Sequence, residues 1–80
     1  MTEKEVQLLG FEKQLGDEGD WYYYTYDVVR GVSFITNSND EVNEDGRWFV
    51  EFFDSDPAIR YWNFVEVQAL INTLQKHIVK

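Results

Sequence analysis

The sequence predicts an α+β fold, an antiparallel meander sheet of four to five strands with one C-terminal α-helix packed on one face. Residues 6–53 are rich in aromatic and β-branched side chains and are broken by short polar segments containing glycine, a pattern typical of strands joined by tight turns. After residue 63 the apolar residues change to the three- and four-residue spacing of an amphipathic helix. A chain of 80 residues is expected to form one domain, residues 1–80.

Polar breaks divide the first part of the chain into strands. Turns are predicted at 16–19 and 30–31, and a polar loop at 37–46. Because these connections are short, neighbouring strands should pair antiparallel. The predicted strands cover 6–13, 21–29, 32–36, 47–53 and, as a short fifth segment, 58–62.

The strand at 21–29 carries aromatic side chains on both faces. Strand side chains alternate between faces, so Trp21 and Tyr23 should share one face and Tyr22, Tyr24 and Tyr26 the other. Either set is apolar enough to face a core. The pattern therefore leaves open which face the helix covers.

The C-terminal segment has the clearest helical pattern in the chain. Asn63 is placed as its N-cap, with Glu66 as the partner in a capping box, and Lys76 and Lys80 suit its C-terminal end. One apolar stripe should face the sheet, formed by Phe64, Val67, Leu70, Ile71, Leu74 and Ile78.

Acidic residues dominate the charge, with 15 Asp and Glu against 7 Lys and Arg and a formal net charge of -8. They are concentrated in 16–27 and 37–56, and we expect one negative surface if the two segments meet. Such a surface repels nucleic-acid phosphates, so direct nucleic-acid binding is not expected, whereas a basic protein would be attracted. The alternative reading is that the acid only keeps a small aromatic-rich protein in solution.

The aromatic residues, 3 Trp, 5 Tyr and 6 Phe, exceed what one small core can enclose. The surplus has three possible places: under the 37–46 loop, half exposed at the surface, or in an interface with a second copy or another protein. Tyr and Trp are enriched in such interfaces because they supply rigid, amphipathic contact area.

No residue pattern points to catalysis, a metal or a cofactor. The chain has no Cys, its single histidine is His77, and no nucleophile elbow or phosphate-binding loop is present. The 37–46 loop lacks the EF-hand pattern. No apolar run is long enough to cross a membrane, and residues 1–5 lack the apolar segment of a signal peptide, so a cytoplasmic location is expected.

The sequence therefore predicts a non-catalytic, acidic protein-binding module, an inhibitor or regulator that occupies a basic surface of its partner protein. A self-associating, homodimeric structural protein is one alternative, and a divalent-metal-binding module is another. An apolar anchor is expected from Tyr22, Tyr24 and Tyr26, or from the other face through Trp21 and Tyr23. The acidic contacts are expected from Asp17, Glu18, Asp20, Asp40, Glu41, Glu44 and Asp45.

Overall fold

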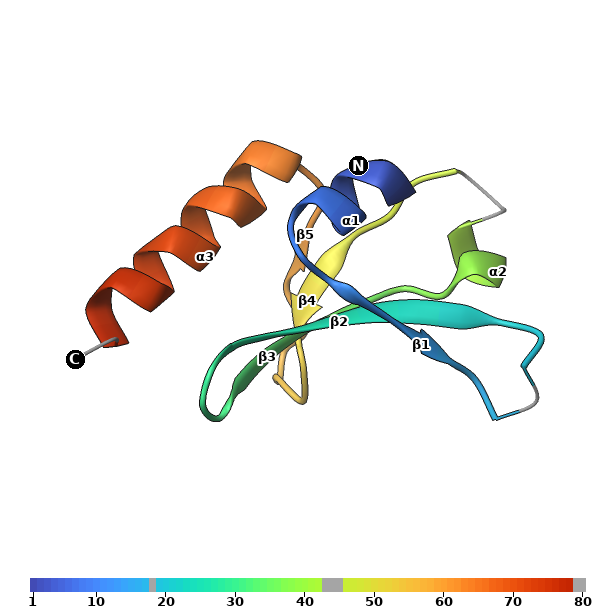
Figure 1. Cartoon of the computed structure of the whole chain (residues 1–80), viewed down its shortest axis with the longest axis horizontal. Coiled ribbons are helices and arrows are strands. Elements are labelled where there is room, and N and C mark those ends of the chain that lie inside the picture. The colour runs from blue at the N-terminus through green and yellow to red at the C-terminus, as the bar shows by residue number, and fades with distance from the viewer. Residues whose placement is uncertain (18, 43–45, 79–80) are drawn as a thin grey trace.

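The computed structural model describes residues 1–17, 19–42 and 46–78. Its strands form one five-stranded antiparallel sheet in the order β1-β2-β3-β4-β5, and the C-terminal helix packs against it (Figure 1). The predicted α+β meander is confirmed. The helices are α1 (Glu3–Leu8), α2 (Asn39–Val42) and α3 (Phe64–Ile78), and the strands are β1 (Glu12–Leu15), β2 (Tyr22–Val29), β3 (Val32–Thr36), β4 (Val50–Phe52) and β5 (Arg60–Tyr61).

The prediction of a strand at 6–13 is wrong for residues 6–8, which belong to α1. The cause is a capping box at Thr2: its hydroxyl accepts a hydrogen bond from the Glu5 amide at 3.2 Å, and the Glu5 carboxylate accepts one from the Thr2 amide at 2.9 Å. Gly10 then turns the chain with a φ of 97°. Strand pairing begins only at Glu12.

The predicted loop at 37–46 contains a short helix, α2, and the predicted strands at 47–53 and 58–62 shorten to β4 and β5. The backbone ahead of β4 finds partners outside the ladder. The Trp48 amide donates to the Met1 carbonyl at 2.9 Å, and the Phe49 amide donates to the Asn37 side-chain oxygen at 3.1 Å.

α3 starts where the capping pattern predicts. The Glu66 amide donates to the Asn63 side-chain oxygen at 3.1 Å, so Asn63 is the N-cap. Within the predicted stripe Val67 and Ile71 are buried, and Leu70 and Leu74 pack partly buried against the same cluster. Ile78 and Lys80 lie outside the side chains that the structure describes.

One hydrophobic core lies between the sheet and the two longer helices. Val6 of α1 and Val67 and Ile71 of α3 join the sheet residues of a single buried cluster, so α1 and α3 cover the same face (Figure 1). The sheet contributes Tyr24, Val28, Phe34 and Val50. The helices therefore cover the face of Tyr22, Tyr24 and Tyr26, and the face of Trp21 and Tyr23 points the other way.

Tyrosine hydroxyls attach α1 to β2. Tyr24 donates to one oxygen of the Glu3 carboxylate at 2.7 Å, and Tyr22 donates to the other at 3.2 Å. Gln7 donates to the Tyr24 hydroxyl at 2.9 Å. Burial first, and then the neighbouring Glu3 carboxylate, raises the pKa of both tyrosines. These contacts place α1 on the sheet with a defined orientation.

Candidate functional site

The sheet face opposite α1 and α3, called the open face below, carries the side chains that alternate with the core residues. The strand register places one residue of each strand in a single row across this face: Glu12, Thr25, Ile35, Glu51 and Arg60. Trp21 and Tyr23 lie on this face at one end, and Phe53, which is 62% exposed, lies at the other. The open face is thus aromatic at both ends.

The side of the open face near β5 is filled by the protein's own contacts. The rings of Phe49 and Trp62 lie 5.1 Å apart, and the Arg60 guanidinium lies 4.4 Å from the Phe49 ring. Arg60 Nε also approaches Glu51 Oε2 to 3.5 Å, an ion-pair contact without hydrogen-bond geometry. These contacts cover this side of the open face, although Glu51 Oε2 is left without a hydrogen bond from the described residues.

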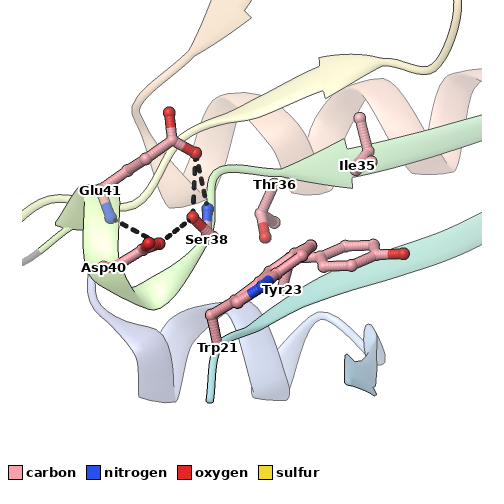
Figure 2. A pocket seen from close by; sticks show the side chains of 7 residues that line it. All are labelled: Trp21, Tyr23, Ile35, Thr36, Ser38, Asp40 and Glu41. Carbon is pink, nitrogen blue, oxygen red and sulfur yellow. Dashed lines mark hydrogen bonds between the residues drawn. The ribbon is translucent and has the colours of Figure 1, made fainter. Parts of the chain in front are cut away.

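At the other end the strands β2 and β3 separate and leave a hollow. Their ladder ends at the pair Thr25 and Ile35. Beyond it the Tyr24 amide donates to the Thr36 hydroxyl at 2.9 Å, and the Tyr22 amide donates to the Asn39 side chain at 2.7 Å. The side chains of Thr36 and Asn39 thus accept the hydrogen bonds that main-chain carbonyls of β3 would accept if the β2–β3 ladder continued. The hollow has a volume of about 510 Å³ and is lined by Trp21, Tyr23, Ile35, Thr36, Ser38, Asp40 and Glu41 (Figure 2).

Two stacked rings line one side of this hollow. Trp21 and Tyr23 stack with their centroids 5.7 Å apart and their planes at 26°. The indole of Trp21 rests against Gly16, where an added Cβ would come within 2.2 Å of it. The Gly16 amide also donates to the Trp21 carbonyl at 2.8 Å. A residue without a side chain at position 16 is therefore required for this ring position.

Two carboxylates stand at the α2 end of the hollow, as Figure 2 shows. Glu41 accepts hydrogen bonds from the Ser38 amide at 3.1 Å and the Ser38 hydroxyl at 3.0 Å. Asp40 accepts from the Ser38 hydroxyl and, at 3.0 Å, from the Glu41 amide. All these donors are neutral, and no ion pair joins either carboxylate to a described Lys or Arg side chain. Both carboxylates are held in place and remain exposed.

The structure changes the apolar part of the predicted site. Tyr24 is only 1% exposed, and Tyr22 and Tyr26 pack against the core, so these three residues do not form an exposed anchor. The reason is that α1 and α3 cover their face. The alternative pair, Trp21 and Tyr23, lies on the open face beside the hollow.

Of the described part of the predicted acidic set, Asp40 and Glu41 line this hollow, whereas Asp17 and Asp20 do not. Asp17 and Asp20 are exposed in the connection between β1 and β2, next to Gly16 and Trp21. The contact between Tyr22 and Asn39 brings the start of β2 beside α2, which carries Asp40 and Glu41 (Figure 1). Glu18, Glu44 and Asp45 lie outside the described residues.

Sequence reasoning missed Ile35, Thr36 and Ser38 as parts of the site. One signal was available for α2: the spacing of Ser38 and Glu41 is that of a capping box, and the structure forms half of it. No sequence pattern marks the point where β2 and β3 separate.

Among the residues described, no group of three or more His, Asp or Glu side chains is arranged to hold a metal ion. None of the helices in the described ranges has the length and apolar character needed to cross a membrane. Comparisons of the chain with protein-family models, with curated proteins and with solved structures find no match.

Proposed function

We propose that this protein is a non-catalytic module that binds a basic segment of a partner protein on its open face. The observation that carries the proposal is the hollow, which is lined both by partly exposed aromatic rings and by carboxylates that have no ion-pair partner among the described residues. By occupying a basic surface the protein would block what that surface otherwise binds, and it would act as an inhibitor or regulator of its partner.

The aromatic part supplies contact area. Trp21 is 36% exposed although it is stacked on Tyr23, and Phe53 is more exposed still. The Trp21 ring is held in place by Tyr23 and Gly16 before binding, so it loses little conformational entropy when a partner covers it. The open face therefore offers anchors at two ends of the sheet.

The acidic part supplies attraction and selectivity. A net charge of -8 attracts basic partners over a distance, and Asp40 and Glu41 place part of it on the hollow itself. Charge of this kind mainly raises the association rate and excludes acidic partners. Nucleic acids are among the molecules that it repels.

Catalysis gains no support at this site. The Ser38 hydroxyl donates to Asp40 and Glu41 as part of the α2 cap, and no described histidine or lysine lines the hollow to act as a base. The carboxylates are exposed to solvent, whereas a general acid needs a desolvated position.

A selection of random peptides displayed on phage tests this function. We expect the selected peptides to be basic, and isothermal titration calorimetry should give a Kd that rises about tenfold or more for Trp21→Ala, the loss typical of an aromatic anchor. Leu8→Ala is the matched control, because Leu8 is 68% exposed on α1, away from the open face. Neutral or acidic peptides, or basic peptides that bind Trp21→Ala unchanged, would refute the proposal.

A further inference from the structure

We propose that the hollow between β2 and α2 receives a single arginine side chain of the partner, with Trp21 and Tyr23 as the stacking surface and Asp40 and Glu41 as the acceptors. This inference rests on the proposed function and names the group that the open face recognises. The hollow, with a volume of about 510 Å³, is open to solvent and has room for one such side chain.

The combination of groups in the hollow matches a guanidinium. A planar cation stacks on aromatic faces, and its edge donates several hydrogen bonds that fit carboxylate oxygens. The stacked rings of Trp21 and Tyr23 provide the faces, and the exposed carboxylates of Asp40 and Glu41 provide the oxygens. Figure 2 shows both kinds of group on the same recess.

Other side chains fit the hollow less well. A lysine ammonium is strongly hydrated and lacks a plane to stack, so it would use the carboxylates but little of the aromatic surface. An apolar side chain would use the rings and leave Asp40 and Glu41 without compensation for the water they lose. A phosphate or carboxylate would be repelled by both.

The groups that line the hollow are held in place before an arginine side chain binds. Gly16 leaves the space in which the Trp21 indole lies. Ser38 holds the carboxylates through its amide, which donates to Glu41, and through its hydroxyl, whose single proton is shared between Asp40 and Glu41. Asn39 fixes α2 to β2 through the Tyr22 amide. Binding would therefore require little ordering of the chain, which favours affinity for a small group.

The test uses the full chain and three small probes in a ¹⁵N NMR titration. The probes are N-acetyl-arginine methylamide, the corresponding lysine derivative and the corresponding citrulline derivative, which has the shape of arginine without its charge. We expect the arginine probe to shift the Trp21 indole N–H and the amides of residues 36–41. Its Kd should be at least about tenfold lower than those of the lysine and citrulline probes.

Variants test the carboxylate acceptors and the aromatic stacking surface of the hollow separately. Asp40→Asn with Glu41→Gln keeps an oxygen acceptor for Ser38 and for the Glu41 amide, so α2 should stay folded while the arginine Kd rises about tenfold. The matched control is Asp54→Asn with Asp56→Asn, which changes the net charge equally in the turn after β4, at the opposite end of β3, and should change that Kd less than about twofold.

Gly16→Ala tests the position of the ring. Gly16 is not one of the glycines with positive φ, so alanine suits its backbone and acts mainly through the indole. We expect a smaller arginine-induced shift of the Trp21 indole N–H in Gly16→Ala, and an arginine Kd raised about as much as by Trp21→Ala. Unchanged arginine binding in Gly16→Ala would contradict the stacking surface.

The outcomes distinguish this inference from the proposed function. If the arginine probe causes no shift at the hollow, or if the lysine probe binds as tightly, the inferred arginine site is wrong. The proposed function could still hold in that case, provided that the selected basic peptides need Trp21. If the arginine probe binds as expected but no basic peptide is selected, the receptor stands and the protein-binding function fails.

Discussion

At the scale of single residues, Tyr24 connects the core to α1 through its hydroxyl. The ring is buried, and the hydroxyl donates to Glu3 at 2.7 Å and accepts from Gln7 at 2.9 Å. Removing a partner from such a pair leaves the remaining polar groups poorly satisfied. The hydrogen bond to a charged acceptor is therefore a large local contribution to stability.

We expect Tyr24→Phe to lower the free energy of unfolding by about 1.5–3 kcal/mol, the usual value of a hydrogen bond to a charged group. Urea unfolding measures this change. Tyr23→Phe is the matched control, because Tyr23 makes no hydrogen bond through its hydroxyl within the described residues, and it should cost less than about 0.5 kcal/mol. Equal losses in the two variants would contradict the contribution of the Tyr24 hydroxyl.

The same tyrosines predict an alkaline loss of stability. Burial and Glu3 raise the pKa of Tyr22 and Tyr24 above the ordinary 10.0, so the folded state holds these protons more tightly than the unfolded state. The resulting stability is complete below pH 10 and is lost as the pH rises above it. Urea midpoints measured between neutral pH and the alkaline range should fall less steeply in the Tyr22→Phe/Tyr24→Phe variant than in the unmodified protein. A parallel fall would show that other groups cause the loss.

At the scale of elements, α3 stabilises the sheet through one face. Ile71 is 6% exposed and joins the core cluster, whereas Val65 on the same helix is 67% exposed. We expect Ile71→Ala to cost about 2–5 kcal/mol, because a cavity replaces buried methyl groups. Val65→Ala is the control and should stay within about 0.5 kcal/mol. Thermal or urea unfolding measures both, and similar small effects would contradict the packing of α3.

The sequence predicts the elements that have a strong pattern and misses those that depend on their ends. β2 and β3 are dense in aromatic and β-branched residues and α3 is periodic, so the sequence predicts their positions well. α1 and α2 are short, and their evidence lies in the capping spacings of Thr2 with Glu5 and Ser38 with Glu41. The covered face was not predictable from alternation, because β2 is aromatic on both sides, and the helix contacts decide it.

The candidate site also has parts that the sequence predicts and parts that depend on tertiary contacts. The clustering of acid in two segments could be read from the sequence, and so could the alternative anchor of Trp21 and Tyr23. The hollow itself depends on where the β2–β3 ladder ends, which is set by tertiary hydrogen bonds from Thr36 and Asn39. A sequence pattern of period two contains no information about that point.

At the scale of the whole molecule, the net charge of -8 opposes pairing of two open faces, since each copy carries the same excess of negative charge. We expect sedimentation equilibrium at low ionic strength to give the mass of one chain, 9.5 kDa. A dimer at low salt that Trp21→Ala dissociates would instead establish self-association through the open face. That result would favour the structural alternative over a basic partner.

Salt should also weaken binding of the selected basic peptides. Exposed charges are screened at roughly 8 Å in physiological salt and more strongly above it. We expect the Kd to rise steadily between low and high ionic strength, with most of the change in the association rate, as stopped-flow fluorescence can resolve. A Kd that is independent of salt would leave the acidic residues without a part in recognition.

Because the β2–β3 ladder ends early, the residues that line the hollow are different from those that stabilise the fold. Trp21, Tyr23 and Ile35 line the recess but do not belong to the buried cluster that holds the sheet and helices together. Substitutions at these three positions can change which chemical group binds in the hollow and should lower the stability of the fold only slightly. The scaffold is accordingly a good starting point for laboratory evolution of new specificities, in which Thr36 and Asn39 are kept and the neighbouring positions are varied.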